Sequence, residues 1–155
     1  MKRIQYHEYG GPETMQLEEV DRPIPGPNQV LIQVKAAGIN ALDWKIRNGA
    51  LRLPDDSGFP KAMGCECAGD IIAMGDSVQG YRVDEPVFGW IPFDRLGGFA
   101  EYATLGIFHR IPPTMSYAQA AALPMVGATA LQAISHAPDQ LMYKRILING
   151  ATGGV

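Results

Sequence analysis

The chain has 155 residues and a formal net charge of −3 at pH 7, with 46% hydrophobic and 19% charged residues. This length and composition are ordinary for a globular protein with a hydrophobic core, so the chain is long enough to fold as one domain. The basic residues are scattered along the sequence, and no apolar stretch reaches the ~18 residues of a membrane span. We therefore expect no binding to nucleic acid or to a membrane.

The first third of the chain predicts short strands separated by glycine- and proline-rich turns. Apolar and polar residues alternate around positions 4–6 and 15–17. Val30, Ile32 and Val34 then mark one face of a strand that continues to position 36.

The middle of the chain predicts one helix and further strands. Residues 41–48 have the composition of a helix, and Gly49 suits the position just after its end. Further strands are expected near residues 68–74, 87–91 and 99–105. The regular spacing of short strands with a helical insertion predicts a partly open β-barrel.

The character of the sequence changes after Pro112 and Pro113. Ser116 followed by Gln119 is a capping-box pattern, in which side chains bond the free N–H groups at a helix start. Pro124 suits the first turn of a second helix that runs to about residue 135, and Pro138 is expected to end this region. A strand over residues 146–149 follows, so the boundary between a β-rich and an α/β region falls near residues 113–116. This strand is expected to be displaced or poorly supported, because the strands and helices that would cover it in a parallel sheet do not occur in the chain.

The last ten residues resemble the start of a dinucleotide-binding βαβ unit. The apolar run 146–149 enters Gly150-x-x-Gly153, and glycines there let backbone N–H groups approach a pyrophosphate. Gly150, Gly153, Gly154 and Val155 are therefore candidate cofactor-binding residues. A third motif glycine, the following helix and the residue that reads the ribose do not occur in the chain, so we expect the front piece of a nucleotide-dependent enzyme. NADP and NAD cannot be told apart from these residues.

Several segments, taken in order, resemble the medium-chain dehydrogenase/reductase superfamily, and most closely its zinc-independent quinone oxidoreductase branch. They are residues 25–40, Asn40-x-x-Asp43-x-x-x-Arg47-x-Gly49, Pro60-x-x-x-Gly64-x-Glu66-x-Ala68-Gly69, Gly97–Tyr102, Ala122-Leu123-Pro124-x-x-Gly127-x-Thr129-Ala130, and the glycine motif at residue 150.

This resemblance implies a mainly β catalytic domain over residues 1–113, built as a GroES-like partly open barrel. Residues 114–155 would be linking helices and the first strand of a truncated Rossmann α/β domain. The implied activity is hydride transfer from NADP(H), with NAD not excluded, to a quinone or a conjugated enone. We expect a cytoplasmic homo-oligomer whose full-length form is active and whose 155-residue piece is not.

The resemblance also identifies the positions at which zinc-dependent relatives hold their catalytic ion. The first is Asn40, a poor zinc ligand, and the second is Cys65, whereas residues 120–135 contain no Cys, Asp or His for the third. We therefore predict no zinc and no other metal. On an extended strand Cys65 and Cys67 share one face, where they are expected to be small buried apolar residues.

Asn40 and Thr129 are the candidate catalytic and cofactor-binding residues of this chain. The resemblance implies that Asn40 contacts a substrate carbonyl or the nicotinamide carboxamide, although Asn also favours the cap position of a helix. It implies a hydroxyl contact of Thr129 near the nicotinamide. Asp43 and Arg47 lie four residues apart and are expected to pair on one helix face.

The sequence departs from many relatives at three places. Lys45 and Leu51 stand where these relatives carry Tyr, and Asp84-Glu85-Pro86-Val87 replaces a Gly-Asp-Arg-Val turn. Two alternatives therefore stay open. One is a zinc-dependent alcohol dehydrogenase-like enzyme, and the other is a GroES-like binding module without catalysis.

Overall fold

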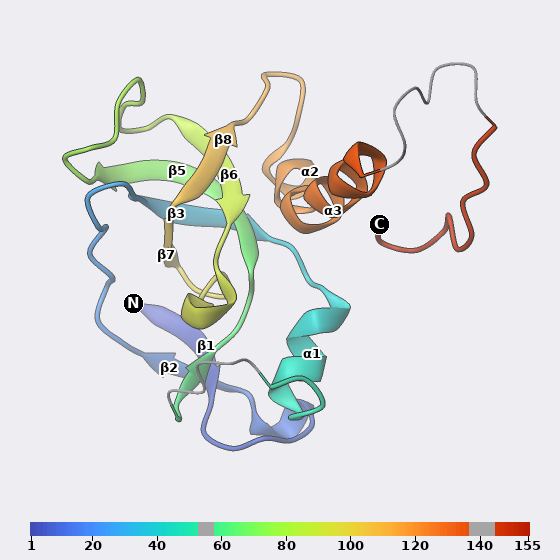
Figure 1. The fold of residues 1–155 in the computed structure, drawn as a ribbon. Helices are drawn as coiled ribbons and strands as arrows, with labels where there is room; N and C mark the ends of the chain where they lie inside the picture. The colour runs from blue at the N-terminus through green and yellow to red at the C-terminus, as the bar shows by residue number, and fades with distance from the viewer. Residues whose placement is uncertain (53–57, 137–144) are drawn as a thin grey trace.

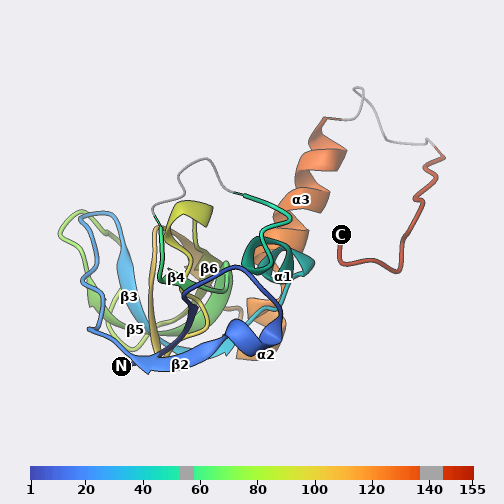
Figure 2. The same ribbon diagram turned by 90° about the horizontal axis from the view of Figure 1, so that it is seen from below.

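The computed structural model describes residues 1–52, 58–136 and 145–155 of the chain. In these ranges two antiparallel sheets form the body of the protein, and the three α-helices lie toward one side of it (Figures 1 and 2). The strands are β1 (Lys2–Tyr6), β2 (Gln16–Glu19), β3 (Val30–Ala37), β4 (Lys61–Ala62), β5 (Glu66–Met74), β6 (Pro86–Trp90), β7 (Tyr102–Leu105) and β8 (Ile107–Arg110). The helices are α1 (Ala41–Arg47), α2 (Tyr117–Ala121), α3 (Pro124–Ser135) and the short 3-10 helices η1 (Pro12–Thr14) and η2 (Phe93–Arg95).

The smaller sheet has the strand order β2-β1-β4 and the larger sheet the order β7-β3-β5-β6-β8. The sheets are joined where Arg3 of β1 forms an isolated bridge with Ala100, next to a hydrogen bond of 2.9 Å from the Ile4 amide to the Phe99 carbonyl. This mainly β architecture with few short helices confirms the predicted fold class. The expected strand at 99–105 is shorter than predicted, and β8, which pairs with β6, was not expected.

The main hydrophobic core lies on the inner face of the larger sheet. Val30 and Ile32 of β3, Ile71 of β5, Val87 of β6 and Leu105 of β7 are completely buried in it. Val30 and Ile32 face this core and Val34 packs against it, as the alternation predicted, but Leu31 between them is buried as well. A second cluster packs Ala120 and Ala121 of α2 against Ala68 and Ile111 of the barrel.

Several local signals in the sequence form the structures that they predict. Helix α1 is followed by Gly49 at φ +79°, and Asp84 takes a φ of 65° in the turn where relatives carry glycine. Ser116 and Gln119 form the predicted capping box at α2. Pro124 occupies the first turn of α3.

The strand expected at residues 146–149 does not form, which agrees with the expectation that it is poorly supported. Residues 145–148 have no regular secondary structure, and Leu147 is 94% exposed. A strand is stabilised by hydrogen bonds to a neighbouring strand, and no described residue pairs with this segment. Both views place the segment beyond α3, away from the sheets (Figures 1 and 2). Pro138 lies outside the described residues, and the domain division at residues 113/114 stays a prediction.

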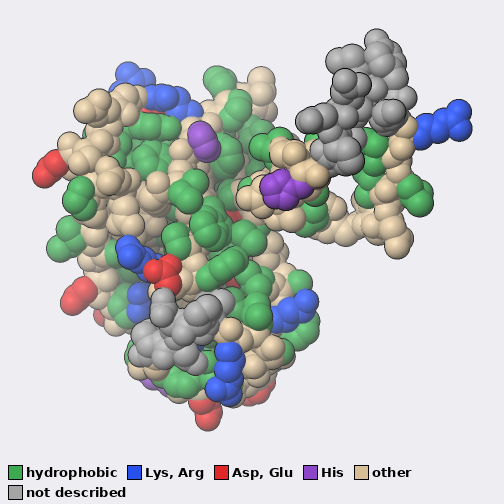
Figure 3. Space-filling model, viewed as in Figure 1, with side chains coloured by type: hydrophobic (Ala, Val, Ile, Leu, Met, Phe, Trp, Pro, Cys, Tyr) green, Lys and Arg blue, Asp and Glu red, His purple; other side chains and the backbone are tan. Residues whose placement is uncertain are grey.

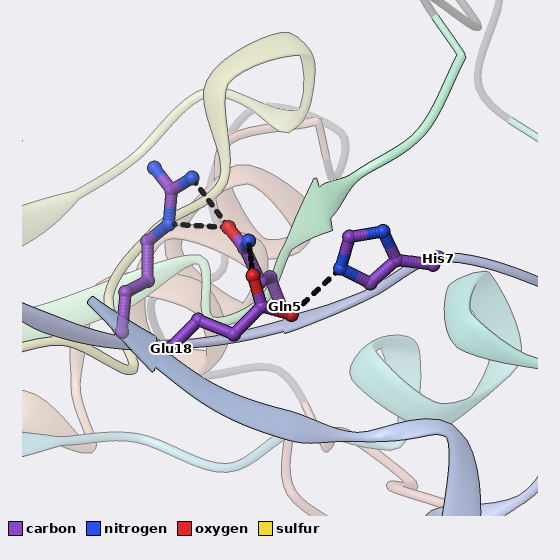
Figure 4. A network of polar contacts seen from close by, with 4 residues as sticks. Gln5, His7 and Glu18 are labelled. Atoms are coloured by element: carbon purple, nitrogen blue, oxygen red, sulfur yellow. Dashed lines mark hydrogen bonds and ion pairs between the residues drawn. The ribbon is translucent and has the colours of Figure 1, made fainter. Parts of the chain in front are cut away.

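A polar network ties β1 to β2 on the surface (Figure 4). Glu18 of β2 accepts hydrogen bonds from Gln5 at 2.5 Å and from His7 at 2.6 Å, and Arg3 donates to Gln5. Because His7 and Gln5 both bond the Glu18 carboxylate, the pKa of Glu18 is lowered. Among the helices of the described residues, none is long and apolar enough to cross a membrane.

Candidate functional site

The candidate site is built at the junction between β3 and α1. Asn40 has an extended backbone, with φ −119° and ψ 152°, and is the N-cap of α1. The backbone N–H of Asn40 donates to Asp43 Oδ2 at 2.7 Å, and this bond satisfies one of the free donors at the helix start. The side-chain Nδ2 donates to Glu66 Oε1 at 2.7 Å and lies 3.6 Å from Cys65 Sγ.

Glu66, the first residue of β5, links this junction to α3. Its side chain is almost completely buried, with 2% exposed. While Oε1 accepts from Asn40, Oε2 accepts from the amide of Met125 at 2.8 Å, and Met125 lies in the first turn of α3. Thr129, one turn further along, donates its hydroxyl to the Met125 carbonyl at 2.7 Å. A continuous hydrogen-bonded path therefore runs from Asn40 through Glu66 and Met125 to Thr129.

Asn40 and Thr129 lie in different cavities. Asn40 lines a cavity of about 780 Å³, named here the Asn40 cavity, together with Asp43, Arg47 and apolar residues of β1, β2 and β3. Thr129 lines a cavity of about 750 Å³ between α3 and strands β6 and β8, named here the aromatic cavity. Glu66 is the connection between the two walls, because its two carboxylate oxygens bond one residue of each cavity, Asn40 and Met125.

Burial shapes the electrostatics around Asn40. Asp43 is 5% exposed, and burial raises the pKa of its carboxyl despite the hydrogen bond from the Asn40 amide. Its second oxygen, Oδ1, is buried and accepts no hydrogen bond of standard geometry from the described residues, although the nearby Gly64 backbone N–H lowers the pKa of the carboxyl. Burial, reinforced by the charges of Asp43 and Glu66, raises the pKa of the Cys65 thiol to about 12. The Cys67 thiol also has its pKa raised to about 12, mainly by burial. Both cysteines are therefore protonated and unreactive at neutral pH.

Comparison with known proteins identifies the family. The family model for the alcohol dehydrogenase GroES-like domain matches residues 26–113, more than half of the chain. The chain belongs to this family. Its relatives place it in the quinone oxidoreductase branch of the medium-chain dehydrogenase/reductase superfamily, as the sequence motifs predicted.

Two curated relatives show how much of a related full-length protein this chain matches. The chain is 35% identical to a quinone oxidoreductase of Mus musculus over 159 residues, which cover 100% of the chain and 46% of that protein. It is 34% identical to a chloroplastic quinone oxidoreductase homologue of Spinacia oleracea over 163 residues, which cover 100% of the chain and 50% of the relative. The chain thus spans about half the length of the curated relatives it matches.

Solved structures show the same relationship. The quinone oxidoreductase of Coxiella burnetii superposes with a TM-score of 0.83 at 33% identity, covering 88% of this chain and 45% of that one. The Escherichia coli quinone oxidoreductase, solved in complex with NADPH, gives a TM-score of 0.79 at 28% identity and covers 90% of this chain and 42% of its own.

The predicted site residues of this GroES-like family member fall into two groups. The structure joins Asn40 and Thr129 through Glu66, and the capping role considered for Asn40 is confirmed. Gly150, Gly153, Gly154 and Val155 lie on the exposed C-terminal segment, where the Gly153 amide donates to the Gly150 carbonyl at 2.8 Å. They line neither of the two cavities, and their contact with a cofactor stays a prediction.

The predicted pair of Asp43 and Arg47 does not form as an ion pair. Asp43 is already bonded to the Asn40 amide, and the Arg47 guanidinium reaches back to the Gly10 carbonyl at 3.3 Å and to Met15 Sδ at 3.4 Å. Arg47 still lowers the pKa of Asp43 through space, although this effect is smaller than that of burial. Asp43 therefore caps the start of α1, and Arg47 ties the helix to the segment around Gly10 and Met15.

Glu66 is a site residue that the local sequence pattern does not reveal. It lies within a glycine motif, and nothing in the neighbouring sequence shows that residues 40, 66 and 125 meet. One signal was present, because an acidic residue at the head of a strand that continues as Cys67-Ala68-Gly69 is expected to be buried. A buried carboxylate requires hydrogen-bond donors nearby.

Proposed function

We propose that the chain is the N-terminal, substrate-side part of an NAD(P)H-dependent oxidoreductase that transfers hydride to a quinone or a conjugated enone without zinc. The orientation of Asn40 carries this proposal. Its Nδ2 is directed to Glu66 and Cys65, and its Oδ1 faces the Asp43 backbone N–H in the capping box, so what Asn40 offers to a ligand is the remaining acceptor lone pair of Oδ1. An acceptor suits the N–H₂ group of a nicotinamide carboxamide and does not suit the carbonyl oxygen of a quinone.

The remaining residues fit a nicotinamide cofactor as well. Gly150 has a φ of +79°, and no atom lies within 4 Å of the place where its Cβ would be, so the turn presents bare backbone as a pyrophosphate site needs. When bound, the cofactor supplies the hydride. The chain's own residues orient the carboxamide at Asn40 and hold α3 in place through the Met125 amide. The cofactor named for the related E. coli structure is NADPH, which favours NADP over NAD.

The donor set supports a zinc-independent reaction. Asn40 and Cys65 are adjacent, as the zinc ligands of zinc-dependent relatives would be, but an amide is a poor zinc ligand and the Cys65 thiol has a pKa of about 12. Helix α3 contains no Cys, His, Asp or Glu. Across the described residues, no group of three or more such side chains is arranged to hold a metal ion. A quinone accepts hydride without strong Lewis-acid help, so orientation and exclusion of water are sufficient tasks for the protein.

The test uses the whole protein that carries this chain. We expect NADPH-dependent reduction of a quinone, with zinc well below one ion per chain in the same preparation. Asn40→Ala is expected to raise KM for NADPH by about tenfold, the loss of roughly one hydrogen bond. Stoichiometric zinc that is required for activity would support the alcohol dehydrogenase alternative. An absence of any NADPH-dependent reduction would support a binding module.

The 155-residue chain is itself the matched control. We expect it to bind NADPH only weakly and to show no turnover, because it holds the carboxamide side of the site without a structured pyrophosphate-binding helix among its described residues. Micromolar binding by calorimetry would contradict this. Homo-oligomer formation stays a prediction, supported by exposed apolar side chains on α3, where Leu131 is 65% and Ile134 57% exposed.

A further inference from the structure

Two of the four asparagines in the chain are followed by glycine, at Asn48-Gly49 and at Asn149-Gly150, and alanine comes next in both places. In an Asn-Gly pair the glycine backbone nitrogen can attack the side-chain carbonyl carbon of the asparagine, since glycine has no Cβ and adopts many backbone conformations. The nitrogen loses its proton, a five-membered succinimide closes, and the side-chain amide leaves as ammonia. Water then opens the ring to aspartate or isoaspartate. Because both pairs stand in the same Asn-Gly-Ala sequence, the fold decides which asparagine reacts.

The fold restrains Asn48. This residue is the C-cap of α1, with φ −84° and ψ 0°, so the Gly49 nitrogen eclipses the backbone nitrogen of Asn48 and lies away from its side chain. The Gly49 N–H donates to the Ile46 carbonyl at 3.0 Å, and Asn48 Oδ1 accepts from the Ala50 N–H at 2.9 Å. Closure of the succinimide at this position therefore requires that two hydrogen bonds break and that the end of α1 unwinds.

Asn149 lacks these restraints within the part of the chain that the structure describes. It lies in an exposed turn that follows residues 145–148, which have no regular secondary structure. The Gly150 N–H donates to no backbone carbonyl of the described residues, and no atom lies within 4 Å of the place where a Gly150 Cβ would be. The space-filling view shows the segment of residues 145–155 standing out from the barrel on the side of α3 (Figure 3). The peptide nitrogen and the side-chain amide can therefore approach each other here.

We propose that Asn149 is a site of spontaneous deamidation, and that its conversion to aspartate or isoaspartate weakens the binding of a dinucleotide at the glycine motif that begins at Gly150. The modification itself is independent of the proposed function, and only its effect on cofactor binding rests on that proposal. Aspartate places a carboxylate directly before Gly150, where the pyrophosphate is expected, and the like charges repel. Isoaspartate also lengthens the backbone by one methylene and displaces the N–H groups that would bind the phosphates.

The first experiment follows both asparagines in the folded 155-residue chain during incubation at pH 8. Trypsin releases Asn48 in the peptide 48–52 and Asn149 in the peptide 146–155, and mass spectrometry measures the conversion of amide to acid in each against a sample taken at the start. We expect Asn149 to deamidate at least ~10-fold faster than Asn48, the factor that the two hydrogen bonds at Asn48 account for. Similar rates at the two sites, or a faster reaction at Asn48, would overturn the inference.

A matched measurement separates the effect of the fold from that of the sequence. In guanidinium chloride that unfolds the chain, the hydrogen bonds of Asn48 are lost, so its rate should approach the rate at Asn149. A difference of ~10-fold that persists in the unfolded chain would contradict the role given to the fold. Asn149→Gln should suppress the reaction in the peptide 146–155, because the longer side chain would have to close a six-membered ring, while Asn48 reacts as before.

The effect on the cofactor is measured in the whole protein with defined variants. Asn149→Asp should raise KM for NADPH about tenfold and leave kcat nearly unchanged, and the rise should shrink at high salt because salt screens charge repulsion. Asn149→Gln adds no charge, and Asn48→Asp adds the same charge outside the glycine motif, so both should keep KM close to the parent value. An equal rise of KM in Asn149→Asp and Asn149→Gln would refute the effect of charge on cofactor binding.

The outcome is separable from that of the proposed function. Deamidation at Asn149 in a protein without NADPH-dependent turnover would refute only the proposed function. Turnover together with equal rates at the two asparagines would refute only the inference.

Discussion

Replacement of Glu66 tests how the site is held together. Its two oxygens accept hydrogen bonds of 2.7 Å from Asn40 and 2.8 Å from the Met125 amide, and the side chain is 2% exposed. A hydrogen bond to a charged group contributes about 1.5–3 kcal/mol. Glu66→Ala removes both bonds, but it also removes a buried charge and so recovers part of its desolvation cost. We therefore expect the free energy of unfolding to fall by about 3 kcal/mol, the lower end of the sum.

Glu66→Gln is the matched comparison because it keeps the shape of the side chain. The remaining oxygen of glutamine can still accept from Met125, but its N–H₂ group then faces Nδ2 of Asn40. Asn40 has to turn its amide over so that Oδ1 accepts from the glutamine. One hydrogen bond to a charged acceptor is replaced by one between neutral groups, so we expect a loss of only about 1 kcal/mol.

The two variants are compared by urea unfolding of the chain, followed by circular dichroism. We expect Glu66→Ala to lose about 2 kcal/mol more than Glu66→Gln, with amide exchange at Met125 accelerated mainly in the alanine variant. In the whole protein, Glu66→Gln should raise KM for NADPH about as much as Asn40→Ala does, since the turned amide offers a donor in place of an acceptor. Equal losses of stability in the two variants, or a loss below about 1 kcal/mol for alanine, would refute the bonding scheme.

Three further predictions follow from the described contacts. Gly38→Ala places a Cβ against the pinned Glu66 carboxylate and 2.7 Å from the Ala121 carbonyl oxygen, so urea unfolding should show a loss of about 1–3 kcal/mol. Because the pKa of the Cys65 thiol is raised to about 12, the folded chain should resist alkylation at pH 8, and rapid labelling before unfolding would contradict this. The pKa of Glu18 is lowered, mainly by the hydrogen bond from His7. This pair should therefore stabilise the fold at pH values above the ordinary pKa of a glutamate. The contribution should be lost as the pH falls through the folded pKa of Glu18. Glu18→Gln should flatten the acid side of a plot of stability against pH, and an unchanged profile would show that the contact contributes nothing.

The features predicted correctly from the sequence depend on local chemistry. The alternation at Val30 and Ile32 fixed the buried face of β3, and Gly49 marked the end of α1. Asp84 takes the left-handed backbone that its side chain tolerates better than most non-glycine residues. Each of these signals involves residues within a few positions of one another, which is why a single sequence was sufficient to read it.

The features that were missed depend on which distant segments meet. The pairing of Asp43 with Arg47 was a correct statement of helix spacing, but Asp43 bonds the Asn40 backbone N–H three residues earlier instead. Arg47 bonds the Gly10 carbonyl, which is the distant contact that the local pattern does not show. The strand at residues 146–149 was predicted from composition, but its formation needs a neighbouring strand that the described residues do not supply. The local sequence is compatible with the expected pair and with the expected strand, but contacts with the rest of the fold decide whether either one forms.

Glu66 shows how the two kinds of information combine at the candidate site. The family resemblance pointed to Asn40 and Thr129 but left open which group Asn40 would bind. The structure adds the buried carboxylate that receives Asn40 Nδ2 on one oxygen and the start of α3 on the other. Because Nδ2 is directed to both Glu66 and Cys65, the oxygen is the side-chain atom left for a ligand, and this supports the proposal that Asn40 binds the nicotinamide carboxamide. The chemistry proposed for Asn40 therefore depends on Glu66, which is why the paired Glu66 variants are tested both for the stability of the chain and for cofactor binding by the whole protein.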